Sequence, residues 1–263
     1  SQPDGSKPID MELGDFFGKT PETVMEDTTI SEEFSAPVYD IEKLDEYVNN
    51  VIRLESVACK DWLTNKVDRS VTGKIARQQT QGEIQLPLSD SGAISLDYKG
   101  FAGMATSLGH APQVAMIDPA AGSVMAVAEA LTNIVFAPLT NGLQSVSLSA
   151  NWMWPCRNPG EDARLYKAVE ACSAFSCDLG INIPTGKDSL SMTQKYGDEK
   201  VYSPGTVIIS AAAEVKNIRK IISPVLAYIK GTYLYYIDFS FDTFKLGGSA
   251  FAQTLGKVGY EAP

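Results

Sequence analysis

The spacing of apolar residues predicts three helices. Between residues 41 and 53, apolar side chains recur every three or four positions, which places them on one side of a helix. A second helix is predicted over residues 119–137 with Asp118 as its N-cap, because an Asp-Pro pair is typical of a helix start. A third is predicted over residues 161–179, where Gly180 suits the left-handed position that follows a helix.

The predicted central helix lacks the charged face of a solvated helix. Its apolar stripe is predicted to be Val124, Val127, Ala128, Leu131 and Val135. The side chains opposite are Gly122, Ala126, Glu129, Asn133 and Ala137. No Lys or Arg occurs in this helix, so we expect both of its faces to be covered. Glu129 is then expected to need a partner, because a buried carboxylate is costly unless it is paired.

Six stretches have the composition or the alternation of strands. They are residues 66–73, 83–96, 145–151, 181–183, 206–215 and 232–239. Strands and helices alternate along the chain, but some strands follow one another directly. This order predicts an α+β fold in which helices cover a mixed β-sheet.

Two further stretches are predicted to be turns. Residues 185–189 do not fit a phosphate-binding P-loop, because Ile181 stands where a Gly is needed and Asp188 where a Ser or Thr is needed. We interpret them as a polar turn between two strands, and a different phosphate or ion role stays open. Gly247 and Gly248 are predicted to turn into a helix that the end of the chain truncates.

Charge and composition exclude several classes of protein. Acidic residues outnumber basic ones by 32 to 22, a net charge of −10, which argues against binding to nucleic acid or to an anionic membrane. We find neither a run long enough to span a membrane nor a secretory signal. The four cysteines form no CxxC pair, which argues against structural zinc and favours a reducing, cytoplasmic location. The one histidine, His110, is interpreted as a structural or surface residue rather than a catalytic one.

Three oxygen-bearing residues form a candidate magnesium site. Glu129 and Asn133 are four positions apart, so both project from one side of a helix. Asp90 lies where a strand ends in a turn, and two carboxylates with an amide oxygen are a partial Mg²⁺ site. The alternative is that Glu129 pairs with a Lys or Arg and that Asn133 caps a loop, and spacing alone favours this alternative. Lys60 either reaches a phosphate or is a solvated surface lysine.

Several longer motifs resemble the phosphoribosylformylglycinamidine synthase family. They occur in the order and at the spacing of that family, between about residue 50 and residue 215. The motifs are residues 68–73, 86–90, 128–133, 148–153, 159–163 and 186–192. The flanks at residues 10–19 and 246–249 resemble the end of the preceding domain and the start of the following one.

The resemblance implies a domain organisation and a reaction. Residues 47–216 resemble the aminoimidazole ribonucleotide synthetase N-terminal-type domain in the second half of a large single-chain enzyme. Residues 1–46 then correspond to the tail of a preceding domain with a linker, and residues 217–263 to the beginning of a truncated C-terminal-type domain. The family is an ATP-dependent carbon–nitrogen ligase of purine biosynthesis, which converts formylglycinamide ribonucleotide and glutamine to the amidine.

The resemblance also implies roles for five residues. Asp90, Glu129 and Asn133 match the magnesium ligands of an auxiliary ATP or ADP site, where a cation would neutralise Glu129. Ser89 matches a neighbouring nucleotide contact at which many relatives carry Ala, and Lys60 matches a phosphate-contacting lysine. We find no counterpart of the first half's histidine loop or Gly-rich loop and no glutaminase triad. Hence no catalytic residue is assigned, and we expect this part alone to be inactive.

Two other interpretations stay open. The chain could be a non-catalytic scaffold half that pairs with the first half of its parent to close a β-barrel. The partners implied by the resemblance are the rest of the parent chain, namely its first half and a glutaminase domain. Without the first half, we expect the chain to self-associate through an exposed sheet. A more distant interpretation is a stand-alone kinase of the same superfold, which residues 152–153 and 186–189 argue against.

Overall fold

The structure is a computed structural model of the 263-residue chain. It describes residues 2–19, 24–30, 32–66, 73–226, 229–238 and 245–262. Most of the predicted strand at residues 66–73, and most of the motif at residues 68–73, lie outside the described residues.

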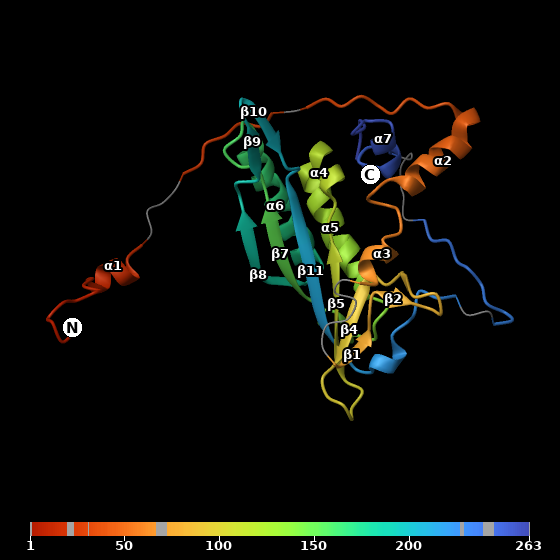
Figure 1. Cartoon of the computed structure of the whole chain (residues 1–263), viewed down its shortest axis with the longest axis horizontal. Helices are drawn as coiled ribbons and strands as arrows, with labels where there is room; N and C mark the ends of the chain where they lie inside the picture. Colours follow the sequence, from red (N-terminus) through yellow and green to blue (C-terminus); the bar gives the residue numbers. More distant parts are fainter. Residues whose placement is uncertain are drawn as a thin grey trace.

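A six-stranded mixed sheet forms the centre of the molecule (Figure 1). All neighbouring strands are antiparallel except β7 and β8, which are parallel. This arrangement confirms the predicted α+β class. In spatial order the strands are β1 (Ile75–Arg77), β4 (Ser91–Ser95), β5 (Gly103–Gly109), β11 (Thr206–Val215), β7 (Ser147–Met153) and β8 (Asn182–Ser189).

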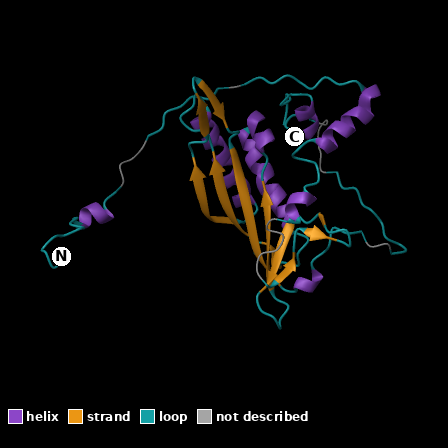
Figure 2. Cartoon of the chain, viewed as in Figure 1, coloured by secondary structure: helices purple, strands orange, loops and turns teal. Residues whose placement is uncertain are grey.

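Helices cover one face of this sheet, as Figure 2 shows. The covering helices are α4 (Pro112–Ile117), α5 (Pro119–Ile134) and α6 (Glu161–Asp178). The remaining elements are α1 (Leu13–Phe17), η1 (Ile41–Lys43), α2 (Leu44–Arg53), α3 (Asp61–Thr64), β2 (Thr80–Gln81), β3 (Leu86–Pro87), β6 (Thr140–Leu143), β9 (Thr193–Tyr196), β10 (Glu199–Tyr202), η2 (Ile218–Lys220) and α7 (Ala250–Thr254). None of the helices in the described part of the chain combines the length and the apolar composition that a membrane crossing requires.

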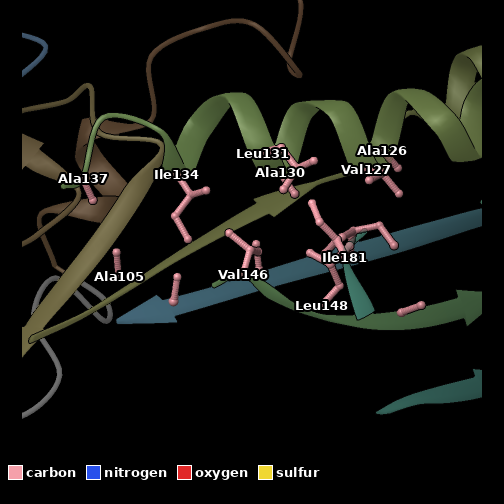
Figure 3. Packing of buried hydrophobic residues seen from close by; sticks show 14 of the residues in the cluster. Ala105, Ala126, Val127, Ala130, Leu131, Ile134, Ala137, Val146, Leu148 and Ile181 are labelled. Carbon is pink, nitrogen blue, oxygen red and sulfur yellow. The ribbon is translucent and has the colours of Figure 1, made fainter. Parts of the chain in front are cut away.

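The core lies between α5 and the strands beneath it (Figure 3). Alternate residues of β11 are buried there, because successive side chains of a strand point to opposite faces. Val146, Leu148 and Ala150 are buried in the same layer, as their alternation predicts. Ile134 of α5 is fully buried over these strands.

The buried stripe of α5 is rotated from the predicted one. Val127 and Leu131 are buried as expected, but Ala126 and Ala130 are buried as well, whereas Val135 is exposed. The helix begins at Pro119 with Asp118 as its N-cap, as predicted, and ends at Ile134 rather than near residue 137. Small alanines face the sheet because α5 approaches its strands closely, so volume rather than hydrophobicity decides which residues face inward.

Three other expectations are wrong. Residues 185–189 continue strand β8 instead of forming a turn, because β7 supplies parallel backbone partners for them. Residues 232–238 contain no strand. Helix α7 ends at Thr254, well before the last residue, and is therefore not truncated. In α6, Cys172 is buried, whereas Val169 is exposed.

Helix α6 receives its N-terminal cap from a distant segment. Gly160, at the N-cap, has a φ of +82° and no side chain that could cap the helix. The carboxylate of Asp27 instead accepts hydrogen bonds from the backbone N–H groups of Gly160 (3.2 Å), Asp162 (3.1 Å) and Ala163 (3.3 Å). Partial desolvation raises the pKa of Asp27, but these bonds and one from the N–H of Thr28 outweigh it, so this pKa lies below its ordinary value.

Candidate functional site

A cavity of about 920 Å³ opens where β5 ends against α5. Its walls come from β4, β5, β11, α5 and the segment before β4. Four of the five predicted site residues, Ser89, Asp90, Glu129 and Asn133, line this cavity. Residues that are far apart in the sequence therefore line the same cavity.

Two hydrogen bonds fix the polar side chains of α5 against the end of β5. Glu129 Oε2 accepts a hydrogen bond from the backbone N–H of His110 at 2.6 Å, and His110 Nδ1 lies 3.9 Å from the same oxygen. Asn133 Nδ2 donates to the carbonyl oxygen of Leu108 at 3.1 Å. This bond uses the amide nitrogen, so the amide oxygen is the atom of Asn133 that a cation would bind.

The close approach of β5 to α5 depends on a glycine. A Cβ atom placed on Gly109 would lie 2.1 Å from the carbonyl oxygen of Ala126 and 2.5 Å from the amide nitrogen of Ala130, so no larger residue fits. Ser107 Oγ also donates to the carbonyl oxygen of Ala130 at 2.6 Å. The strand end is therefore held tightly against the helix, and this contact sets the positions of His110 and Glu129.

The segment before β4 carries the other two site residues. The backbone N–H of Ser89 donates to the carbonyl oxygen of Gln79 at 3.0 Å, which holds the segment beside β2. The Oγ of Ser89 is buried and has no hydrogen-bond partner among the described residues. Asp90, the next residue, is exposed to the cavity. A buried hydroxyl without a partner is costly, so this wall is suited to a ligand that hydrogen-bonds it.

The charge of the cavity favours a cation. Among the described residues that line it, two are carboxylates and none is Lys or Arg. The described residues contain no group of three or more His, Cys, Asp and Glu side chains that could hold a metal alone. Two carboxylates and an amide oxygen fit a hard divalent ion that completes its coordination with water or phosphate oxygens.

The surroundings of three residues, Glu129, Lys60 and His110, differ from those expected from the sequence. Glu129 is not buried, because its side chain is 48 % exposed, and its partner is His110 rather than a Lys or Arg. Lys60 does not line the cavity, and its Nζ donates to the carbonyl oxygen of Ala58 at 2.9 Å. His110 lines the cavity, which its sequence context did not predict.

The uncovered face of the sheet forms one side of the cavity. Thr106 and Leu108 of β5, and Ile208 and Ser210 of β11, point away from the helices and line it. The alternation of residues 206–215 could have predicted this face, because the positions between the buried ones must point the other way.

Comparison with known proteins identifies the family of this chain. Residues 59–214 match the family model of the FGAR-AT PurM_N-like domain. The chain is 43 % identical over 217 residues to human phosphoribosylformylglycinamidine synthase, an alignment that covers 82 % of this chain and 16 % of that protein. It is 39 % identical over 265 residues to the Drosophila melanogaster protein of the same name. That alignment covers 97 % of this chain and 19 % of the Drosophila protein. The chain thus spans less than a fifth of the length of these relatives.

A solved structure shows a weaker likeness. The structure of Thermotoga maritima PurL complexed with ADP is similar with a TM-score of 0.49 and 17 % sequence identity, over 78 % of this chain and 29 % of that one. The family match covers more than half of the chain and includes β1 to β5, α4 to α6 and nearly all of β11. The chain therefore belongs to the FGAR-AT PurM_N-like domain family, the family that its motifs predicted.

Proposed function

We propose that this chain is the second synthetase-like half of a phosphoribosylformylglycinamidine synthase and that its cavity holds a nucleotide through Mg²⁺. Asp90, Glu129 and Asn133 are the proposed cation ligands. The observation that carries the proposal is that these three residues and Ser89 line one cavity whose described lining contains no Lys or Arg.

Charge explains why a cation is needed between protein and nucleotide. The phosphates of ATP or ADP are anionic, and the two carboxylates would repel them in the absence of a cation. A divalent ion bound by Asp90, Glu129 and Asn133 would offset both sets of charges. Lys60 is not part of this proposal, because it lies outside the cavity.

The parent reaction is proposed from the family. Its relatives are named phosphoribosylformylglycinamidine synthase, and the resemblance implies ATP-dependent transfer of ammonia from glutamine to formylglycinamide ribonucleotide. We assign this chain an auxiliary nucleotide site and no catalytic residue of that reaction. Residues 47–216 are the proposed domain, with residues 1–46 and 217–263 belonging to its neighbours.

Thermal unfolding with ADP tests the proposed site. Ligand at a hundredfold excess over its dissociation constant is expected to stabilise the chain by about 2.7 kcal/mol when Mg²⁺ is present. EDTA is expected to abolish the shift, and so is the variant Asp90→Ala. A Gln144→Ala variant, at an exposed position outside the cavity, serves as the control. A shift that survives in both EDTA and Asp90→Ala would refute the cation ligands.

The second candidate function is that of a scaffold half. The observation that favours it is the uncovered sheet face, where Leu108 is 59 % exposed and Ile94 is 42 % exposed. Such a face suits pairing with a second sheet. Light scattering is expected to show self-association at high concentration that Leu108→Glu weakens. A monomer at all concentrations would contradict it.

A further inference from the structure

A strap of extended chain crosses the start of α6. We use this name for residues 24–30 and 32–40, which contain no helix or strand. All side chains from residue 24 to residue 30 are exposed. The carboxylate of Asp27 holds the strap on α6 through three backbone N–H groups. The strap supplies none of the described residues that line the candidate nucleotide site, so the proposed function leaves it without a role.

Acidic residues surround a threonine in the strap. Glu26 and Asp27 precede Thr29, and Glu32 and Glu33 follow it. The hydroxyl of Thr29 is exposed and forms no hydrogen bond within the described part of the chain. This hydroxyl is therefore accessible and chemically uncommitted.

This pattern suits a protein kinase that prefers acidic substrates. Such a kinase lines its substrate groove with Lys and Arg, which recognise carboxylates by charge-assisted hydrogen bonds. It reads an acidic residue three positions after the accepting hydroxyl, which is the place of Glu32 relative to Thr29. Thr28 has no acidic residue three positions on. The accepting oxygen must lie in line with the γ-phosphate of ATP, and an exposed segment without helix or strand can be placed in this way.

Beside Thr29 lies a cavity of about 550 Å³ that contains both signs of charge. It is separate from the candidate nucleotide site, with which it shares no lining residue. Its basic lining residues are Arg164, Lys167 and Lys245, and its acidic ones are Glu32, Asp118 and Glu261. Two of the basic residues come from α6, the helix that the strap caps.

Lys167 is the basic residue of this cavity whose charge is not already used. Arg164 pairs with Glu161, with 3.5 Å between Nε and Oε1. Lys245 pairs with Glu261, with 3.9 Å between Nζ and Oε2. Lys167 has no ion-pair or hydrogen-bond partner for its side chain among the residues that the structure describes. An added anion at the edge of the cavity would therefore find an ammonium group available.

We propose that Thr29 is a phosphorylation site for an acid-directed Ser/Thr protein kinase and that its phosphate pairs with Lys167. In this step the Oγ1 of Thr29 attacks the γ-phosphorus of ATP, the hydroxyl proton is lost and ADP leaves. The phosphate adds about two negative charges at pH 7. It fastens the strap to α6 at a second place, beyond the cap that Asp27 supplies. The proposal does not depend on the candidate nucleotide site.

Phosphorylation in vitro tests the acceptor. The intact chain is incubated with a purified acid-directed Ser/Thr kinase and Mg–ATP, and mass spectrometry locates the phosphate. Thr29→Ala is expected to abolish the modification, and Glu32→Gln to slow it about tenfold, because a charge-assisted contact with the kinase is lost. Thr28→Ala is the matched control and is expected to change nothing. No phosphate on Thr29, or a rate that Glu32→Gln leaves unchanged, would overturn the assignment.

Thermal unfolding tests the pairing with Lys167. At pH 7, phosphorylation is expected to raise the melting temperature of the unaltered chain by about 2–4 °C. The rise is expected to disappear in Lys167→Ala and to remain in Lys195→Ala, whose exposed lysine lies outside the cavity. It is also expected to shrink at pH 5, because the second pKa of the phosphate is about 6. Absence of a rise in the unaltered chain, or an equal rise in Lys167→Ala, would refute the pairing. Ala is a strong helix former, so Lys167→Ala should keep α6 intact, which circular dichroism checks.

Discussion

Replacing Gly109 by Ala tests whether the contact between β5 and α5 positions the candidate site. The new Cβ would lie 2.1 Å from the carbonyl oxygen of Ala126, where about 3.4 Å is the ordinary limit of contact. The obstacle is helix backbone, so β5 must move away by about 1 Å. Overpacking of this kind costs about 1–3 kcal/mol. The same movement lengthens the bond from the His110 N–H to Glu129, which adds about 1 kcal/mol.

The total expected loss is therefore about 2–4 kcal/mol in the free energy of unfolding, measured by urea denaturation. The loss is expected together with weaker Mg²⁺-dependent binding of ADP, because Glu129 loses its fixed position. Gly92→Ala is the matched control: Gly92 lines the same cavity, but the nearest atom to an added Cβ there is Thr106 Oγ1 at 3.6 Å. Equal stability of the two variants would refute the argument that backbone contact at Gly109 sets the site.

Three further predictions concern the rest of the molecule. The pKa of Asp27 is lowered in the folded state, so the Asp27 carboxylate stabilises the fold above its ordinary pKa of 3.8, and this stabilisation is lost as the pH falls below that value. The stability of the Asp27→Asn variant should therefore depend less on pH in acid. An acid transition that is unchanged in this variant would contradict the prediction. Cys59 and Cys177 are exposed and should react quickly with a thiol reagent at pH 8. Burial is the main cause that raises the pKa of Cys156 to about 12, and the nearby acidic side chains add to it. Cys156 should therefore stay unreactive until the chain unfolds. Leu148→Ala should cost about 2–5 kcal/mol in urea denaturation, because Leu148 is 1 % exposed between sheet and helices; a loss below 1 kcal/mol would mean that the core closes around the gap.

The sequence correctly predicted those helices and strands whose residues have strong local preferences, such as a capping residue or an apolar run. Asp118 followed by Pro119 marks the start of α5, and the run from Thr206 to Val215 is the strand β11 over its whole length. The joint position of Asp90 with Glu129 and Asn133 followed from the family resemblance, and the residues do line one cavity. Spacing alone favoured other roles for them, because it carries no information on which strands are neighbours.

The failures have a common physical cause, since each depends on tertiary neighbours. Residues 185–189 are polar and mostly exposed, yet backbone pairing with β7 makes them an edge strand. Val135 is exposed although it continues the predicted stripe, because α5 ends before it. His110 gave no signal because the contact with Glu129 exists only after β5 docks on α5.

The cap that Asp27 supplies to α6 has a consequence for truncation design. A shorter protein starting at residue 47 would keep the family-matched region and every residue of the candidate site. It would nevertheless lose the acceptor for three N–H groups at the first turn of α6, where Gly160 offers no replacement. The smallest piece that retains all contacts of this helix therefore starts before residue 27, so the physical unit extends about twenty residues upstream of the proposed domain boundary.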